Sequence, residues 1–499
     1  MTVDIDTSNL PEAVGERHIL QPLEELRVEV PYGTQTQTAN FILQKGSCEL
    51  WGCELALGKQ YSVATGGLKL ALFTWHGCVI DVDADVEISY TSDETTSNVA
   101  YVNTHAQLEA LRDEAYQEQQ QRQQQQHNQT QQKDPMNSNT ADPKLLQGPR
   151  VMVVGPSESG KSSLCKTLVA YATKVGRTPL WVDLDPVDNC ISVAGSLSVA
   201  PMIASAVTVE TYATCGIPPN TVHPLAMYHG STSKLHPDLF RAQVDRLAQN
   251  VNQRLAQDEN AQSSGIIVNT NGWIQDEGYK LLLHVAEAME ISVILILGHD
   301  RLYSMMNSHY KKMVQKDATA TVPKVLKLPR SGGVVSRPQT FVHHSQSRAV
   351  KRYFYGEFID PPKTIETTAV TSKVPQLTPF LLQLKFADVE IYRLSSMALS
   401  SSLLPVAQQQ TTDAVQISKV DLDTEAESLQ HALLAVCHPS SVTKWQASGR
   451  ARDLVCAGVA GFCAVERIHS DTDALHLLSP CAGSLPSQTL LLGDITWME

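Results

Sequence analysis

The chain of 499 residues carries a formal net charge of −13, and 42% of its residues are apolar. This length corresponds to about three domains of ordinary size, and the apolar fraction excludes a chain that is disordered throughout. The acidic balance excludes a uniformly basic nucleic-acid-binding protein and leaves only a local basic surface for that role. The sequence has no run of about 18 uncharged apolar residues and no signal-peptide pattern, so we expect a soluble intracellular protein without membrane association.

The first hundred residues show short runs in which apolar and polar residues alternate, with turn residues between them. Such runs predict strands with one buried face, and many short strands separated by turns are typical of a small antiparallel sandwich or barrel. The runs lie at 26–30, 39–43, 48–52, 69–75 and 86–90. We place this first domain at residues 1–116.

A glutamine-rich stretch follows the first domain. Residues 117–132 contain eleven glutamines, and an Asp-Pro pair with several Asn and Ser residues comes next. Because this composition offers few apolar side chains for a core, it predicts a disordered linker over 117–147. An interaction tract and a tolerated expansion both fit the composition.

From Arg150 the pattern changes to unbroken apolar runs that alternate with helical segments. Unbroken apolar strands between helices predict a parallel sheet with helices on both faces, which we place at 148–376. Alternating runs return after about residue 378 and predict a small β-rich domain at 377–499. The predicted strands of the central sheet lie at 151–154, 180–184, 266–269, 293–297 and 325–328.

The stretch from Gly155 to Ser162 matches the phosphate-binding pattern G-x-x-x-x-G-K-[ST]. It follows an apolar strand and opens a helix, which is the context of a P-loop NTPase sheet. In such a loop backbone N–H groups surround phosphate oxygens, Lys161 brings a cation to the terminal phosphates, and the Ser162 hydroxyl can ligate Mg²⁺. The predicted nucleotide-binding residues are Gly155, Ser157, Glu158, Ser159, Gly160, Lys161, Ser162 and Ser163.

Two carboxylates end the next predicted strand. Strand alternation points Asp183 and Asp185 to the same side, at the carboxyl edge of the sheet where ligands bind in such folds. One carboxylate there can hold Mg²⁺ and one can accept the proton of an attacking hydroxyl, whereas the alternative is an acid that only caps a helix. We assign these roles to Asp185. A guanine-nucleotide switch is not expected, because the string nearest to N-K-x-D, at 418–421, lies out of order in the last domain.

Ten Lys or Arg residues and one acid lie between residues 311 and 352, a local charge of +9 in an acidic chain. This concentration indicates contact with a polyanion, and the phosphates of the nucleotide are one candidate. Arg348 and Arg352, spaced i,i+4 on an expected helix, could both face the phosphate being transferred. Trp273 ends another sheet strand, where its indole either stacks on an unpaired base or lies in the core.

A set of short segments occurs in a fixed order along the chain, at 73–78, 101–105, 148–156, 160–162, 268–273, 301–303, 331–335 and 353–356. Together they closely resemble the Clp-type polynucleotide 5′-hydroxyl kinases, which are subunits of the pre-mRNA cleavage and polyadenylation machinery. The resemblance runs from about residue 20 to the end, interrupted by the glutamine-rich stretch. It implies an N-terminal β-sandwich, a central P-loop kinase domain and a small C-terminal β domain.

The resemblance also implies ligands and partners. In active members ATP with Mg²⁺ donates a phosphate to the free 5′-OH of RNA. The family works in the nucleus in 3′-end formation, beside other cleavage factor subunits, notably one that binds the RNA polymerase II tail. Some members are linked to the tRNA-splicing endonuclease. By position, Glu25 and Lys69 resemble the residues of the N-terminal domain that contact adenine.

Further roles follow from position in the same way. Lys161 and Ser162 correspond to the P-loop lysine and serine of the family. Asp185 corresponds to the carboxylate that activates the hydroxyl, and Trp273 to the aromatic residue that clasps the RNA end. The pair formed by Arg348 and Arg352 resembles the lid arginines.

The chain departs from the family pattern at one place. Active kinases read D/E-x-D-x-G-Q after the second strand, whereas this chain reads Asp-Leu-Asp-Pro-Val-Asp at 183–188. Val187 restricts a backbone that glycine leaves free, and Asp188 puts an acid beside phosphates where an amide would donate hydrogen bonds. Two hypotheses therefore stay open: an RNA 5′-hydroxyl kinase, and a catalytically silent subunit whose bound ATP holds the three domains together as a scaffold.

Overall fold

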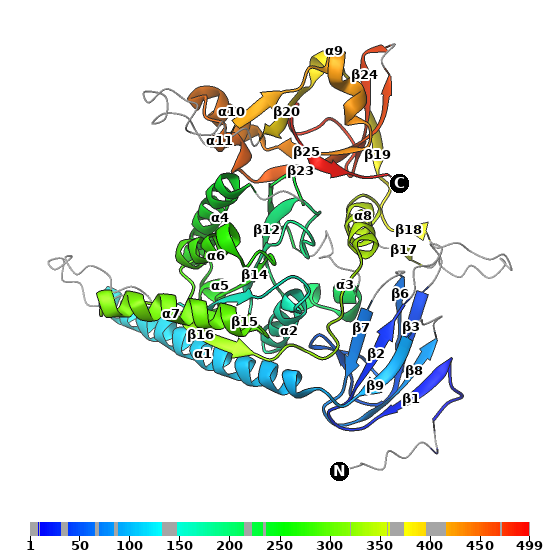
Figure 1. Cartoon of the computed structure of the whole chain (residues 1–499), viewed down its shortest axis with the longest axis vertical. Helices are drawn as coiled ribbons and strands as arrows, with labels where there is room; N and C mark the ends of the chain where they lie inside the picture. The colour runs from blue at the N-terminus through cyan, green and yellow to red at the C-terminus, as the bar shows by residue number, and fades with distance from the viewer. Residues whose placement is uncertain are drawn as a thin grey trace.

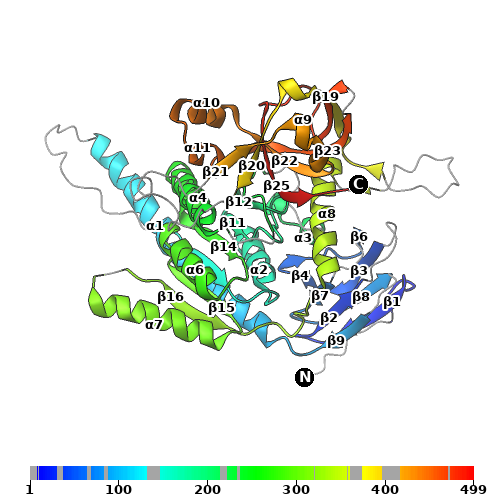
Figure 2. The ribbon, with the colours of Figure 1, turned by 45° about the horizontal axis from the view of Figure 1, so that its top comes forward.

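The computed structural model shows three domains in chain order, with the central domain between the two β-rich ones (Figure 1). Turning the molecule keeps this arrangement and shows α8 running between the C-terminal domain and the N-terminal strands (Figure 2). Among the described residues, none of the helices combines the length and the hydropathy that a membrane-spanning segment needs. The structure describes residues 8, 10–30, 38–64, 69–83, 88–131, 147–213, 222–232, 236–319, 321–356, 358–359, 374–395, 416–469 and 472–498.

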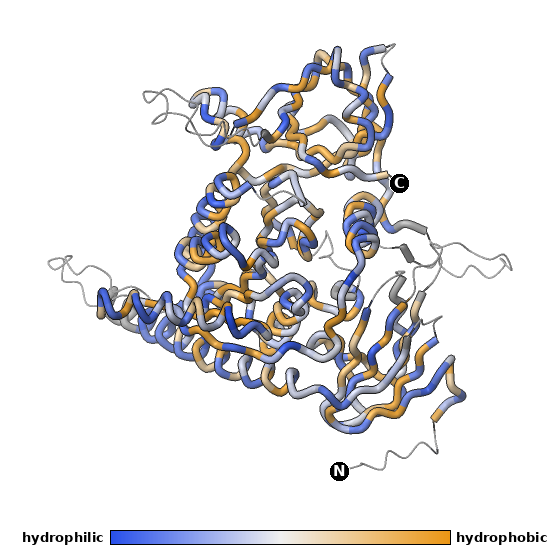
Figure 3. The backbone as a smooth tube through the Cα atoms, viewed as in Figure 1, coloured by the Kyte–Doolittle hydropathy of each residue, from blue (hydrophilic) through white to orange (hydrophobic). Residues whose placement is uncertain are grey.

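The N-terminal domain is a sandwich of two antiparallel sheets rather than a barrel, which confirms the predicted β-sandwich. One sheet has the order β1-β8-β3-β6 and the other the order β5-β4-β7-β2-β9. Hydrophilic and hydrophobic residues alternate along these strands (Figure 3), and inward side chains such as Leu26, Phe41 and Ile80 share one core. The strands are β1 (Glu16–Leu20), β2 (Glu25–Glu29), β3 (Thr38–Gly46), β4 (Glu49–Leu50), β5 (Cys53–Glu54), β6 (Gln60–Ala64), β7 (Lys69–Phe73), β8 (Cys78–Asp83) and β9 (Ile88–Ser92).

The central domain holds a seven-stranded sheet in the order β13-β12-β11-β14-β10-β15-β16. The strands from β11 to β16 in this order are parallel, as predicted, whereas β12 and β13 are antiparallel additions at one edge that the sequence analysis missed. The strands are β10 (Arg150–Val154), β11 (Leu180–Leu184), β12 (Ser196–Pro201), β13 (Leu225–Tyr228), β14 (Ile266–Thr270), β15 (Val293–Leu297) and β16 (Lys324–Leu328). A short pair of strands follows, β17 (Phe358–Ile359) and β18 (Val374–Pro375).

Helices cover both faces of the central sheet, as the unbroken apolar strands predict. Val151 and Val153 of β10 belong to the core that includes α2, whereas Met152 and Val154 belong to the core that includes α4 and α6. Because helices cover both faces, the carboxyl edge of the sheet is where a ligand can approach, and the loop after β10 lies at this edge. The helices are α2 (Lys161–Lys174), α3 (Val209–Ala213), α4 (Pro237–Gln257), α5 (Glu259–Ser264), α6 (Asp276–Ala288), α7 (Asp300–Lys316) and α8 (Gln339–Tyr355).

The helix that links the first two domains, α1 (Thr96–Gln131), extends well into the glutamine-rich stretch. The prediction of disorder is therefore wrong for residues 117–131, whereas 132–146 lie outside the described residues. Glutamine is a good helix former, and Gln119 is buried against α5, where its amide donates to Gln262 Oε1 at 2.8 Å. Composition alone could not reveal this tertiary contact.

In its described residues the C-terminal domain is a seven-stranded sheet in the order β19-β24-β23-β22-β25-β20-β21, with three short α-helices. It covers the antiparallel edge of the central sheet, where Tyr228 Oη donates to the Leu433 carbonyl at 3.0 Å and Gln243 Nε2 donates to the Val455 carbonyl at 3.0 Å. The elements are β19 (Phe380–Lys385), β20 (Glu390–Ser395), β21 (Gln416–Lys419), α9 (Leu422–Glu425), β22 (Ala432–Cys437), α10 (Pro439–Ser448), α11 (Arg452–Val455), β23 (Val459–His469), β24 (Ala474–Ser479) and β25 (Thr489–Thr496).

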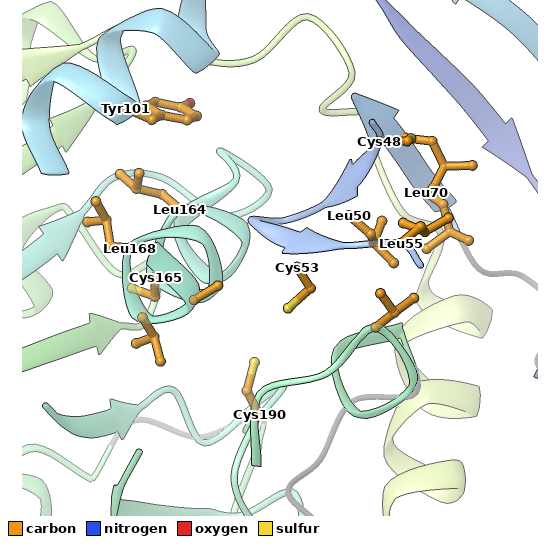
Figure 4. Packing of buried hydrophobic residues seen from close by; sticks show 14 of the residues in the cluster. Cys48, Leu50, Cys53, Leu55, Leu70, Tyr101, Leu164, Cys165, Leu168 and Cys190 are labelled. Atoms are coloured by element: carbon orange, nitrogen blue, oxygen red, sulfur yellow. The ribbon is translucent and has the colours of Figure 1, made fainter. Parts of the chain in front are cut away.

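The core of the N-terminal sandwich continues without a break into the central domain. Leu50 of β4 lies in the same buried cluster as Leu168 of α2 (Figure 4). The turn between β4 and β5 consists of Trp51 and Gly52, both with positive φ, and a side chain at Gly52 would meet Ala170 of α2 at 3.0 Å. The sandwich is thus fixed directly against the helix that follows the phosphate-binding loop.

The helical state of the glutamine-rich stretch can be tested at Gln119. Replacing it with alanine should destabilise the α1–α5 contact by about 1 kcal/mol, because the two hydrogen bonds that its buried amide donates are lost. Hydrogen exchange measured by mass spectrometry should then show faster exchange over residues 117–124. Gln120→Ala, which changes an exposed neighbour, is the matched control. Rapid exchange of this stretch in the unaltered protein would contradict the helix.

The junction with the C-terminal domain should make stability depend on pH through His229. This side chain contacts Gln243, and burial lowers its pKa to about 4. An unfolded histidine binds a proton near pH 6.5, so the folded state should lose up to about 3 kcal/mol as the pH falls from about 6.5 to about 4. Urea unfolding at several pH values should show this loss, and His229→Gln should remove it. The exposed His343→Gln should retain it; equal pH dependence in both variants would contradict the assignment.

Candidate nucleotide-binding site

The phosphate-binding loop connects the end of β10 to the start of α2, as the sequence predicts. Glu158 and Gly160 have positive φ values of 56° and 90°, a backbone arrangement that points successive N–H groups into one concavity. A side chain at Gly160 would meet Val334 at 2.9 Å, and one at Gly155 would meet Ser159 Oγ at 2.6 Å. The loop is therefore a tightly packed anion site at a helix N-terminus.

Lys161 and Ser162 stand on the first turn of α2, at the mouth of this loop. Lys161 Nζ donates to the Pro156 carbonyl at 2.8 Å, and burial lowers the pKa of Lys161 although the nearby Asp185 favours its charged form. Ser162 Oγ accepts a hydrogen bond from Asn269 Nδ2 at 3.3 Å. An anion in the loop would therefore meet a buried ammonium group and an oriented hydroxyl.

A cavity of about 640 Å³ opens above the loop, between the N-terminal sandwich, the sheet edge and α8. This volume suits a ligand of nucleotide size. Of the residues predicted from the sequence, those that line it are Glu25, Lys69, Ser157, Glu158, Ser159, Gly160, Lys161, Ser162, Ser163, Asp185, Trp273 and Arg348. Gly155 belongs to the loop and packs closely against Ser159, but it does not line the cavity. Arg352 is likewise not among the described residues that line it.

The two carboxylates at the end of β11 have separate surroundings. Asp183 is fully buried, and its carboxylate accepts hydrogen bonds from Asn269 Nδ2 at 3.0 Å and from the Cys190 backbone N–H at 2.9 Å. Burial and the neighbouring Asp185 raise the pKa of Asp183 to about 7. Asp185 lines the cavity, and burial raises its pKa while Lys161 opposes the shift. Asp183 therefore organises the loop, whereas Asp185 is available to a ligand.

Asn269 joins the candidate site through its side-chain amide, and no sequence pattern marked it. Its amide joins Asp183 on β11 to Ser162 on α2, so it fixes two neighbouring strands to the P-loop helix. Among the described residues no cluster of three His, Cys, Asp or Glu side chains could hold a metal ion. Ser162 and Asp185 could still hold Mg²⁺ together with phosphate oxygens, which is the usual way this ion is bound with nucleotides.

The wall opposite the P-loop belongs to the N-terminal sandwich. Glu25 accepts a hydrogen bond from Arg27 Nε at 2.6 Å, and burial raises its pKa although Arg27 opposes the shift. Lys69 Nζ donates to Glu29 Oε2 at 2.7 Å. A side chain at Gly333 would lie 3.1 Å from Arg27 Nε, so the segment before α8 passes closely over this wall. Arg27 also lines the cavity, although no sequence pattern marked it.

Trp273 and Arg348 reach the cavity from different elements. Trp273 is half-buried after β14, and its ring meets Phe240 edge-on with centroids 6.4 Å apart, so it is neither free nor enclosed in the core. Arg348 lies on α8, and its Nε is buried without a hydrogen-bond partner among the described residues. Arg337, which the sequence analysis counted only within the basic segment, lines the cavity as well. Lys311, by contrast, is exposed on α7.

Comparison with known proteins accounts for this combination of domains. Three family models match the chain: "N-terminal beta-sandwich domain of polyadenylation factor" at 19–115, "mRNA cleavage and polyadenylation factor CLP1 P-loop" at 155–356, and "Pre-mRNA cleavage complex II protein Clp1" at 377–499. Protein CLP1 homolog of Dictyostelium discoideum is 33% identical over 96% of this chain and 89% of its own length. Protein CLP1 homolog of Arabidopsis thaliana is 30% identical over 99% of this chain and 95% of its own.

Solved structures of Clp1p share the fold. A structure that concerns the extended interface between Pcf11p and Clp1p aligns with a TM-score of 0.73 at 19% identity, covering 98% of this chain and 100% of that chain. The wild-type Clp1p–Pcf11p complex aligns with a TM-score of 0.69 at 20% identity, covering 98% and 99%. These structures support the three-domain fold, and the sequence relatives establish the family. The chain belongs to the Clp1 family of pre-mRNA cleavage and polyadenylation factors.

Proposed function

We propose that this chain is an ATP-dependent polynucleotide 5′-hydroxyl kinase that works within the pre-mRNA cleavage and polyadenylation machinery. One observation carries the proposal: a single cavity is lined by the P-loop residues Lys161 and Ser162, the carboxylate of Asp185, the indole of Trp273 and the unpaired Nε of Arg348. Phosphoryl transfer needs these kinds of groups around a nucleotide and an acceptor, because its catalysis consists mainly of positioning and charge stabilisation.

Several buried donors fit the triphosphate of ATP. Ser159 Oγ and Arg348 Nε are both buried without hydrogen-bond partners among the described residues, and an anion would satisfy them. Lys161 adds a positive charge at the same place. One solved relative is described as giving the basis of ATP loss in a glycine-to-arginine mutant, which associates ATP with that relative. The polar residues Glu25 and Lys69 on the opposite wall are suited to contact the adenine.

The proposed reaction uses each group in turn. The RNA 5′-hydroxyl, held beside Trp273, attacks the γ-phosphorus, and its proton passes to the Asp185 carboxylate. This carboxylate lines the cavity, where it is placed to accept the proton. The bond between the γ-phosphorus and the bridging oxygen breaks, and ADP leaves. Lys161 and Arg348 stabilise the charge on the transferred group. Mg²⁺, held by Ser162 and Asp185, would supply further positive charge to the phosphates.

The departure at 187–188 does not oppose this reaction. Val187 has no positive φ, so the backbone does not require glycine there. Asp188 accepts a hydrogen bond from Arg337 Nη1 at 2.7 Å, so its charge is balanced within the protein. Neither feature therefore excludes the kinase, and both are equally compatible with the silent scaffold. If the chain is instead the silent scaffold, the same cavity would retain ATP between two domains without hydrolysing it or transferring its phosphate.

The family also suggests where the chain works. Two solved relatives are complexes of Clp1p with Pcf11p. We therefore propose a counterpart of Pcf11 as a partner of this chain, in the role of the subunit that binds the RNA polymerase II tail. Pre-mRNA cleavage takes place in the nucleus, which we propose as the location. RNA is the proposed substrate, and the tRNA-splicing endonuclease is a further proposed contact.

A transfer assay tests the kinase. Purified protein with γ-labelled ATP and a 5′-OH oligoribonucleotide should yield labelled RNA, and Lys161→Ala should reduce the rate at least about 100-fold. Trp273→Leu should raise the KM for RNA by about 10-fold or more and leave ATP affinity unchanged, since base stacking contributes about 1–3 kcal/mol. Lys174→Ala, on the same helix as Lys161 but outside the cavity lining, is the matched control.

The assay also separates the two hypotheses. Bound ATP that is recovered on denaturation, together with no label transfer to RNA, would reject the kinase in favour of the scaffold. In that case Lys161→Ala should still lower the melting temperature, because a ligand that binds only the folded state stabilises it. Absence of both transfer and bound ATP would reject both hypotheses.

A further inference from the structure

The N-terminal half of α8, together with Arg337 just before the helix, is attached to the loop after β11 by three polar contacts. Arg337 Nη1 donates to Asp188 Oδ2 at 2.7 Å, and Ser345 Oγ donates to Asp188 Oδ1 at 3.2 Å. Gln346 Nε2 donates to the Val187 carbonyl at 2.8 Å. All three contacts therefore end on the two residues at which this chain departs from the pattern of active family members.

Asp188 and Arg337 form more than an isolated surface pair. Their side chains are 21% and 32% exposed, and the Arg337 backbone N–H also donates to Glu158 Oε1 at 2.5 Å. Although burial works against it, the Arg337 charge holds the pKa of Asp188 below its ordinary value. Arg337 thus joins the phosphate-binding loop and the loop after β11. Removing one partner would leave a half-buried charge behind, which costs more than breaking an exposed pair.

The two halves of α8 are held in different ways. In the C-terminal half, Val350 and Phe354 belong to a buried core with the C-terminal domain, and Tyr353 Oη accepts a hydrogen bond from the Phe462 backbone N–H at 2.9 Å. The N-terminal half faces the cavity and has Phe341 as its buried apolar residue. Its position over the cavity therefore depends strongly on the polar contacts to Val187 and Asp188.

We propose that Asp188 is a positioning residue that anchors the N-terminal half of α8 over the cavity and so sets how long a bound nucleotide stays. Arg348 lies three residues after Ser345, on the same side of the helix, so the anchor also determines where its guanidinium stands. The inference rests on the proposed binding of ATP but not on phosphate transfer. It gives the unusual acid at 188 a role in holding the helix.

Dissociation of a fluorescent ATP analogue, measured by stopped flow with excess ATP as the chase, tests the anchor. Asp188→Asn keeps the size of the side chain and removes its charge, and it should speed release about 10-fold. Arg337→Gln should do the same. The double variant should release the analogue no more than about 2-fold faster than the faster single variant, because both changes break one contact. Ser345→Ala, a milder change, should speed release about 3-fold.

A matched control comes from the C-terminal domain. Glu390 forms an ion pair with Lys419 at 2.7 Å, the same N–O distance as between Arg337 and Asp188. Glu390→Gln breaks this pair, and Glu390 does not line the cavity. Its release rate should equal that of the unaltered protein. Release changed less than 2-fold by Asp188→Asn, or independent effects of the two single variants, would overturn the anchor. Slower release in Asp188→Asn would also overturn the anchor. It would mean that Arg337, no longer paired with Asp188, binds the nucleotide more tightly.

A readout without nucleotide separates this inference from the proposed function. In the ligand-free protein, hydrogen exchange over 341–348 should be faster in Asp188→Asn than in the unaltered protein or in Glu390→Gln. Unchanged exchange would overturn the anchor whether or not ATP binds. Failure of the unaltered protein to bind the analogue, with faster exchange in Asp188→Asn, would reject the nucleotide site and leave the anchor standing.

Discussion

The site depends on one packing constraint, the continuous core between the N-terminal sandwich and α2. A P-loop alone offers a phosphate site at one end of a helix, open to solvent. Here the β4–β5 turn lies against Ala170, and Leu50 shares a core with Leu168, so the wall that carries Glu25 stands at a fixed distance from Lys161. Because interiors of this kind are close-packed, the cavity between the two domains has a defined size.

Local patterns in the sequence predicted most of the architecture and the P-loop, because strand alternation and a strand–loop–helix motif are encoded by neighbouring residues. What failed depended on contacts between distant residues. The helix of 117–131 rests in part on Gln119 meeting α5, which composition cannot show. Likewise, spacing grouped Arg348 with Arg352, but only the docking of α8 decides which of them faces the cavity.

The departure at 187–188 shows how a substitution that seems harmful in isolation can be accommodated by its surroundings. In the sequence, Asp188 is an extra negative charge beside phosphates. In the structure its charge is met by Arg337 and its second oxygen by Ser345, both from a segment about 150 residues away. The electrostatic cost at the site is thereby reduced, and the acid gains a structural partner in α8. The motif alone therefore does not decide between the kinase and the silent scaffold for this chain.

Both hypotheses require that ATP binds in the cavity between the P-loop and the N-terminal sandwich. Photo-crosslinking with an azido-adenine analogue of ATP, followed by peptide mapping, tests it most directly. We expect magnesium-dependent labelling of peptides from β2 or β7, suppressed by unlabelled ATP and by Lys161→Ala. Labelling confined to the C-terminal domain, or labelling that excess ATP does not suppress, would show that ATP does not bind in this cavity.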